Sequence, residues 1–458
     1  MRIIQWWKTK YIYFIIYFAA VLAIWKFIGP ISICDTLVPP NTESIQIKNR
    51  IIDASDIEAI NNNPKINRLL FYNCDFNSID LDKPDIAFFG CHFANDAMTN
   101  SNLHAESLSF ELCTGDMDFS FIEKINSLEN LTINNSGLND SNAPGLLPSG
   151  LKNLCIRDNT DLTQLSWINP DIVSVDCSGS GIVSLGYIAK LQNIRTLRCD
   201  NCPISSINEP FDATFLHTLS IKGLGLRDCP GLANLTLLSD VNLEGNSFID
   251  FSFLSRSSEA LRALNISNNP VTQDGIEILT SFANLEELYM CGFKTSNISF
   301  AENMPRLHII CAVNCGLNSI EGLRNLENLS IVRLAFNEIS DISPLSRSAQ
   351  SGNLKVIDIY HNNISDIHSI ENMNGERVVL FENPIDIENY NNDFLNTIAQ
   401  FLYFKRSDGK YLMIDTKRDG GSAYPYSYIS DKAVEELQKV ETEENGVISN
   451  YNSILMKW

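Results

Sequence analysis

Basic side chains are scarce in this sequence of 458 residues. It holds 34 Lys and Arg against 55 Asp and Glu, which gives a net charge of −21 with histidine neutral. A surface this acidic repels phosphate backbones. We therefore expect no nucleic-acid partner.

Motifs for common reaction centres and bound groups are also absent. The six histidines show no H-E-x-x-H or other paired spacing, and there is neither a glycine-rich phosphate loop nor a G-x-S-x-G turn. Cys199 and Cys202 form a C-x-x-C pair, but no second pair completes a structural zinc site. No cysteine follows Cys315, so a carboxy-terminal domain has no thiol nucleophile. We predict a protein that is not an enzyme and needs no cofactor or metal.

An apolar and aromatic run lies near the amino terminus. Residues 11–28 hold a single charge, Lys26, and 18 residues of helix span about 27 Å, near the ~30 Å hydrocarbon core of a bilayer. Arg2, Lys8 and Lys10 precede the run, so the positive-inside rule places the amino terminus in the cytoplasm and the rest of the chain outside. We predict an uncleaved transmembrane signal anchor. A cleaved signal peptide and a buried segment are the alternatives, although no A-x-A site follows the run.

Most of the chain follows one repeating pattern. From Ile66 onward the template L-x-x-L-x-L-x-x-(N/C)-x-L recurs about every 22 residues, with clear copies at 329–345 and 354–370. The L-x-L part suits a short strand whose alternate side chains share a face, and the following I-x-x-I-x-x-L spacing suits a turn or 3₁₀ segment. One repeat buries about five apolar side chains, worth about 10 kcal/mol, which is less than the cost of ordering it. The repeats must therefore stack.

This pattern resembles that of the leucine-rich-repeat proteins, and its 22-residue form resembles the internalins and the leucine-rich phosphatase regulators. The resemblance covers about residues 45–390. It implies an α/β repeat fold, a leucine-rich-repeat solenoid with a curved parallel β-sheet on the concave face and turns or 3₁₀ segments on the convex face. It implies partner binding, but the family binds many unrelated partners, so it names none.

The predicted organisation has six parts. They are a cytoplasmic basic stub (1–10), the anchor (11–28), a linker (29–44), an amino-terminal cap (45–65), about 15 repeats (66–389) and a carboxy-terminal cap or small accessory domain (390–458). The amino-terminal cap includes a short helix at 53–61 that stops at Asn63-Pro64. The carboxy-terminal part includes a β-hairpin around Asp408-Gly409.

Twelve cysteines require an explanation in a chain predicted to leave the cytoplasm. Five occupy the ninth template position, where a small polar residue is buried beneath the turn: Cys74, Cys91, Cys113, Cys202 and Cys315. Cys155, Cys291 and Cys311 should instead face the concave surface and form the reactive set. Buried reduced thiols favour the cytosol. Because free cysteine also packs well as a small apolar residue, we retain the anchor.

Two groups of concave residues are candidates for partner binding. The carboxy-terminal repeats present an apolar patch with a charged rim, typical of an interaction hot spot: Tyr289, Val313, Arg333, Asp358, Tyr360, His361 and Phe381. The middle repeats alternate in charge and contribute Arg157, Arg198 and Lys222. Each group has an alternative. Segment 390–458 can fold over the patch, and the charges can form a ladder of ion pairs worth at most about 1 kcal/mol each.

These observations predict a membrane-anchored, non-catalytic scaffold whose concave face binds another protein. A composition rich in Asn, Ile and Lys suggests an AT-rich genome, so we expect a bacterial inner-membrane, periplasmic or cell-surface protein. The alternative is that the repeats position residues 390–458, which then act in glycan binding or as a toxin or immunity module. A purely structural envelope element is a third possibility. The sequence names neither the partner nor the oligomeric state.

Overall fold

The computed structural model of the chain describes residues 31–33, 36–39, 41–98, 101–405, 411–415 and 427–428. The described residues up to Ile182 form one compact unit, and those from Val183 form a second. We call them unit 1 and unit 2. The predicted stub and anchor lie outside the described residues. No helix within the described ranges is long and apolar enough to cross a bilayer.

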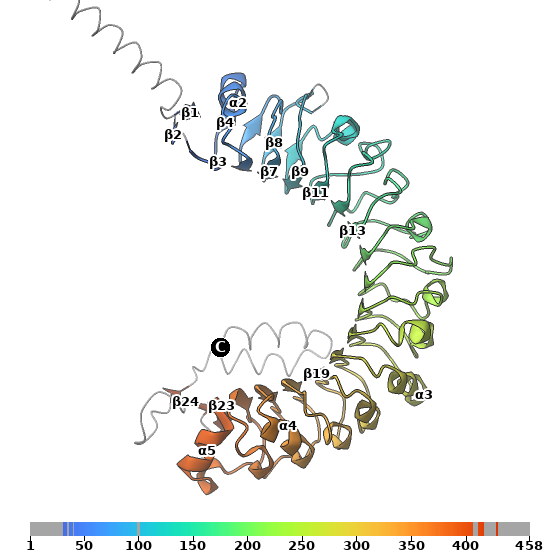
Figure 1. Cartoon of the computed structure of the whole chain (residues 1–458), viewed down its shortest axis with the longest axis vertical. Helices are drawn as coiled ribbons and strands as arrows, with labels where there is room; N and C mark the ends of the chain where they lie inside the picture. The colour runs from blue at the N-terminus through green and yellow to red at the C-terminus, as the bar shows by residue number, and fades with distance from the viewer. Residues whose placement is uncertain are drawn as a thin grey trace, which may run out of the picture. The chain divides into compact units, whose positions relative to one another are not determined.

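Each repeat of unit 1 contributes one strand to a parallel sheet (Figure 1). The strands pair in register, in sequence order: β3 (Ser44–Lys48), β5 (Arg68–Tyr72), β7 (Asp85–Phe89), β9 (Ser107–Glu111), β11 (Asn130–Asn134), β12 (Asn153–Cys155) and β13 (Ser174–Asp176). Burial alternates along β9 and β11, as period-2 strands require. The sheet already includes β3, within the predicted amino-terminal cap.

Unit 1 has a second parallel sheet that the sequence analysis did not predict. Its strands are β4 (Ile51–Ile52), β6 (Asp75–Phe76), β8 (His92–Phe93) and β10 (Thr114–Gly115). Phenylalanines fill the core around these strands. The Phe88 ring stacks on Phe71 at 5.4 Å and on Phe110 at 5.0 Å between centroids, and Phe76 stacks on Phe93 at 5.4 Å. These rings explain why the first repeats depart from the leucine template.

The cap helix predicted at 53–61 is confirmed as α2 (Ala54–Asn61). Asp53 accepts from the backbone N–H groups of Ser55 and Asp56, and the Asp56 side chain closes a capping box. At the other end the buried Lys83 Nζ donates to Asn63 O at 2.8 Å. Strands β1 (Ile31–Ile33) and β2 (Thr36–Val38) form an antiparallel pair beside this cap.

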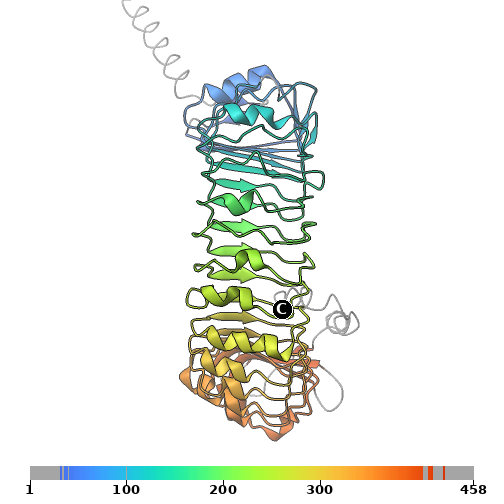
Figure 2. The same cartoon turned by 90° about the vertical axis from the view of Figure 1, so that its right-hand side faces the viewer.

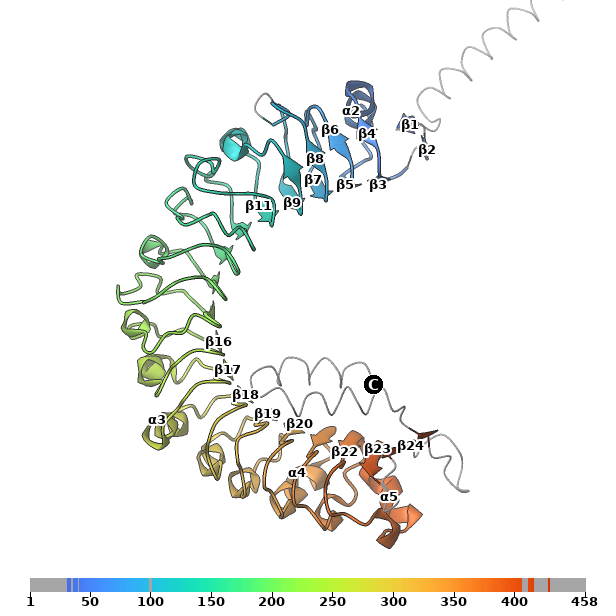
Figure 3. The same cartoon turned by 180° about the vertical axis from the view of Figure 1, so that it is seen from behind.

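Unit 2 continues the same plan with shorter strands. Its parallel sheet runs β14 (Thr196–Arg198), β15 (Thr218–Ser220), β16 (Asp240–Asn242), β17 (Ala263–Asn265), β18 (Glu287–Tyr289), β19 (Ile309–Cys311), β20 (Ile331–Arg333), β21 (Val356–Asp358), β22 (Gly375–Val379) and β23 (Ala399–Lys405). The strands line the inner side of the curve of unit 2 (Figure 3). Strands β14, β15 and β16 begin 22 residues apart, as the predicted period requires.

The predicted 3₁₀ segments are confirmed on the side opposite the strands. In unit 1 there is η1 (Phe119–Lys124). In unit 2 the segments are η2 (Ile188–Lys190), η3 (Pro230–Leu232), η4 (Ser252–Ser257), η5 (Ile278–Ser281), η6 (Ser299–Asn303), η7 (Glu321–Leu323), η8 (Ser343–Leu345), η9 (His368–Ile370) and η10 (Ile387–Asn389). Short helices α3 (Gln273–Glu277), α4 (Ser346–Ser351) and α5 (Asn392–Ile398) join them. Figure 2 shows the coils of unit 2 stacked one on the next, each with its helical part on the same side.

Side chains at the ninth template position join neighbouring coils. The Asn337 amide donates to Ala312 O and Leu334 O, both at 2.8 Å, and its oxygen accepts from Cys315 N and Leu317 N. The five ninth-position cysteines are buried as predicted, and the sulfurs of Cys74, Cys91, Cys113 and Cys315 donate to backbone carbonyls. This ladder satisfies backbone groups that lack a strand or helix partner.

The carboxy-terminal hairpin is confirmed in its strands. β23 pairs antiparallel with β24 (Tyr411–Asp415), and β24 pairs with β25 (Ser427–Tyr428). The predicted Asp408-Gly409 turn lies outside the described residues. On its other edge β23 pairs in parallel with β22, so the repeat sheet continues past residue 390.

Candidate partner-binding surface

The candidate surface is the face of each parallel sheet that points away from the 3₁₀ segments, which we call the strand face. Its residues are the first, third and fifth of each strand register, because alternate side chains leave a strand on opposite sides. All ten predicted binding residues belong to these positions or lie directly after them. The structure places Arg157 in unit 1 and the other nine in unit 2.

The strand face of unit 1 carries two ion pairs between neighbouring strands. Arg157 Nε donates to Asp176 Oδ2 at 2.8 Å, and Arg68 Nε lies 3.0 Å from Asp85 Oδ2. The Arg157 side chain is half exposed, so this pair is worth at most about 1 kcal/mol. For the charged residues, these contacts favour a ladder of ion pairs over a surface kept free for a partner.

Two aromatic rings also lie on the strand face of unit 1. Tyr72 and Phe89 stack at 4.9 Å between centroids, and Lys48 Nζ lies 5.1 Å from the Tyr72 ring centre. The stacking uses the facing sides of both rings, and the lysine covers a further part of the tyrosine.

A charged side chain on the strand face of unit 2 is also paired. Lys222 Nζ lies 3.0 Å from Glu244 Oε1, on the neighbouring repeat. Arg198 is exposed on β14 and Lys222 is partly exposed. These positions are accessible, but none of them touches the apolar cluster of the later repeats.

The later repeats of unit 2 form one apolar group, which we call the strand cluster. Its buried members are Cys291, Cys311, Val313, Ala335, Tyr360, Val379, Phe381 and Tyr403, and Tyr289, Phe336, Phe401 and Met413 pack against it. Four predicted binding residues, Tyr289, Val313, Tyr360 and Phe381, are thus brought together.

The expectation that this patch is exposed is wrong. Val313, Tyr360 and Phe381 are each 2% exposed, and the Asp358 carboxylate on the same face is 0% exposed. Phe401, Tyr403 and Met413 belong to segment 390–458, so part of that segment packs on the patch, as the alternative anticipated. A local repeat pattern reports which face a side chain takes, but not what later parts of the chain place on that face.

Tyr289 remains partly exposed at the edge of the strand cluster. Its hydroxyl donates to Glu287 Oε2 at 3.0 Å. Burial, followed by the nearby Glu287 carboxylate, raises the pKa of Tyr289 to about 12. The phenol is therefore neutral at physiological pH and acts as a hydrogen-bond donor.

The remaining rim residues have different environments. Arg333 is half buried on β20, in register with Asp358 on β21. His361 is exposed, and its ring stacks on Phe336 at 5.3 Å between centroids. Of the three predicted rim residues, Arg333 and His361 are thus accessible, whereas the Asp358 carboxylate is buried.

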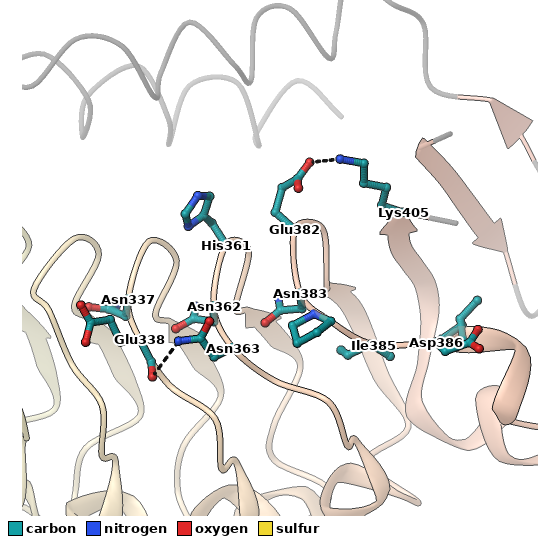
Figure 4. Close-up of a pocket in the computed structure, with 12 residues that line it drawn as sticks. Asn337, Glu338, His361, Asn362, Asn363, Glu382, Asn383, Ile385, Asp386 and Lys405 are labelled. Carbon is teal, nitrogen blue, oxygen red and sulfur yellow. Dashed lines mark hydrogen bonds and ion pairs between the residues drawn. The ribbon is translucent and has the colours of Figure 1, made fainter. Parts of the chain in front are cut away.

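A cavity of about 750 Å³ opens beside His361 (Figure 4). Glu382 and Lys405 form an ion pair of 2.6 Å at its edge. Asn362 and Asn383 lie along it with Asn337, but their amides already donate to backbone carbonyls. The groups left for a ligand are scattered surface side chains, so the cavity has the size of a binding site without a convergent set of polar groups.

The cysteine pair at 291 and 311 was predicted only in part. The two thiols take the strand face as expected, but each is 1% exposed, whereas Cys155 is partly exposed. Their sulfurs lie 3.0 Å apart. The sequence signal is a cysteine at the seventh position of one repeat and the fifth of the next. No group of three metal-ligating side chains occurs among the described residues.

Comparisons with known proteins place the fold. No family model and no curated protein matches the sequence. Among solved structures, a TLR13–ssRNA13 complex is 13% identical over 80% of this chain and 67% of that chain, with a TM-score of 0.51. An internalin (inlF) from Listeria monocytogenes is 22% identical over 62% of this chain and 75% of that chain, with a TM-score of 0.48. A leucine-rich-repeat protein from Leptospira interrogans is 16% identical over 64% and 88%, with a TM-score of 0.47.

At these identities the likeness concerns the fold alone. Together with the in-register parallel strands, the ninth-position ladder and the 22-residue period, it identifies a leucine-rich-repeat fold, as predicted.

Proposed function

We propose that the chain is a non-catalytic, membrane-anchored scaffold that binds another protein through the strand face. The observation that carries this proposal is the accessible charge on the strand face of two successive repeats of unit 2, at Arg198 and Lys222. In unit 1, Arg157 takes the same face. Strands held in register about 4.8 Å apart form a rigid template that loses little entropy on docking. The TLR13 structure, a complex with an RNA, supports ligand binding as a use of this fold. An acidic chain favours a protein over a nucleic acid.

Because the strand cluster is buried, we do not propose it as the centre of the partner contact. Val313, Tyr360 and Phe381 contribute chiefly to packing, while Arg198, Lys222 and the partly exposed Tyr289 lie where a partner can reach them. Rim charges of this kind act mainly on association rate and selectivity.

Site-specific photo-crosslinking in the native cell tests this surface. A photoreactive residue at position 198 or 222 should give discrete adducts of higher mass. The matched control is Ser255, which is exposed on η4, on the opposite side of unit 2. Equal adducts from position 255, or none from 198 and 222, would remove the strand face of these repeats as the contact.

The anchor at 11–28 belongs to the same proposal. It concentrates the repeats at the bilayer and, by the positive-inside rule, outside the cytoplasm of a bacterial cell. The support is the apolar run with Arg2, Lys8 and Lys10 before it.

The alternative, in which residues 390–458 carry the activity, has a structural argument against it. β23 is a strand of the repeat sheet, and its Tyr403 lies in the strand cluster. A chain that ends after Asp415 keeps β23 and β24 and discriminates the two functions. If partner binding persists in it, the remaining carboxy-terminal residues are not the active part.

A further inference from the structure

Two buried thiols of unit 2 form a close pair that the binding function does not use. Cys311 lies in β19, opposite Tyr289 of β18, and Cys291 follows Tyr289 by two residues. Their sulfurs are 3.0 Å apart, and each side chain is 1% exposed. Both belong to the strand cluster, so apolar side chains surround them.

Hydrogen bonds make the two thiols chemically unequal. Cys291 Sγ can donate to Cys311 O at 3.4 Å, and in the contact between the two sulfurs either can be the donor. The hydrogen bond from Cys311 lowers the pKa of Cys291, and the same bond raises the pKa of Cys311. Cys291 is therefore the nucleophile of the pair, because the thiolate is the reactive form.

The neighbouring thiol Cys315 is engaged elsewhere. Its sulfur donates to Met290 O at 3.2 Å and to Val313 O at 3.5 Å, within the ninth-position ladder. Burial raises its pKa. Cys311 is thus the partner that Cys291 can reach without breaking backbone contacts.

We propose that Cys291 and Cys311 are a peroxide-oxidised dithiol site that closes to a disulfide between β19 and the turn that follows β18. The Cys291 thiolate attacks one peroxide oxygen, the O–O bond breaks, and a sulfenic acid remains on Cys291. The hydroxide that leaves takes the proton of the Cys311 thiol and departs as water. The Cys311 thiolate then attacks the Cys291 sulfur, the S–O bond breaks and the S–S bond forms. The second hydroxide takes up the proton that Cys291 had released and departs as a second water. The two thiols lose two electrons and the peroxide gains them.

The test uses the full-length chain and hydrogen peroxide as the probe. The reduced protein is treated with peroxide, its free thiols are blocked by alkylation, and its peptides are mapped by mass spectrometry. The expected first product is one peptide pair that joins Cys291 to Cys311 and separates on reduction. In Cys311→Ser a sulfenic acid should persist on Cys291 and be trapped by dimedone, whereas Cys291→Ser should give no sulfenic acid on Cys311.

Other cysteines provide the internal controls. Cys155 is partly exposed, so its oxidation shows that the peroxide has acted. Cys229 is buried without a sulfur neighbour among its described contacts, and it serves as the buried thiol that should form no disulfide. Failure of the 291–311 link to form when Cys155 is fully oxidised would overturn the proposal. A dominant link elsewhere, for instance between Cys74 and Cys91, would overturn it too. The wild-type map decides the question even if a serine variant does not fold.

Discussion

One backbone conformation recurs at the residue before each ninth template position. Fifteen such residues have φ between 45° and 76°, the left-handed region, and eleven of them are Gly, Asn or Asp, which adopt it at little cost. The exceptions are Leu112, Phe336, His361 and Glu382. Each of these side chains must offset a backbone cost of about 1–2 kcal/mol.

Leu112 gives the clearest test, because its side chain is 62% exposed and has little packing to lose. We expect Leu112→Asn to raise the free energy of unfolding by about 1 kcal/mol, since Asn tolerates φ near 56° better than Leu. Urea unfolding of the two proteins measures the difference.

Phe336 is the matched control at the same template position. It has the same φ of 56°, but its ring packs edge-on against Tyr360 at 4.9 Å and stacks on His361. Phe336→Asn should therefore lower stability, since the lost packing exceeds the relief of backbone strain. If Leu112→Asn lowers stability as Phe336→Asn does, backbone conformation does not explain the choice of residue here.

At the scale of structural elements, the ninth-position ladder replaces the hydrogen bonds that short strands cannot supply. Asn337→Ala leaves buried partners such as Ala312 O and Leu317 N without their side-chain bond. We expect a loss of about 2–4 kcal/mol in the free energy of unfolding, because several buried groups are left unsatisfied. Asn363→Ala, in the next coil, removes only a 3.5 Å contact of an exposed amide and should cost less than about 0.5 kcal/mol. Equal losses would contradict the role assigned to the ladder.

The elements also show what the sequence could and could not predict. The strands, the 3₁₀ segments and α2 follow local periodicity and capping, so a single sequence was sufficient for them. The second sheet of unit 1 was missed because its strands, such as β6 and β8, have two residues each. Such strands are too short to show a period of two.

The candidate surface was predicted less completely than the fold. Template positions correctly placed Val313, Tyr360 and Phe381 together on one face. Their burial was anticipated only as an alternative, because it involves residues far along the chain, including Phe401 and Met413, which the local pattern does not place. The contact between Cys291 and Cys311 was implied by their positions in adjacent repeats, but the 3.0 Å separation needed the three-dimensional structure.

At the scale of the whole molecule, we propose that an anchor presents the strand face outside the cytoplasm. Cys155 is suited to test this claim, because it lies on the strand face of unit 1 and is partly exposed. Cys155→Ser removes the thiol and serves as the control that assigns the signal.

The most direct measurement is labelling of Cys155 with a membrane-impermeant maleimide, in intact bacterial cells with a permeable outer layer and in inverted inner-membrane vesicles. If the strand face lies outside the cytoplasm, we expect labelling in the cells, none in sealed inverted vesicles, and loss of the signal in Cys155→Ser. Labelling only in the inverted vesicles would place the repeats in the cytoplasm and contradict the account.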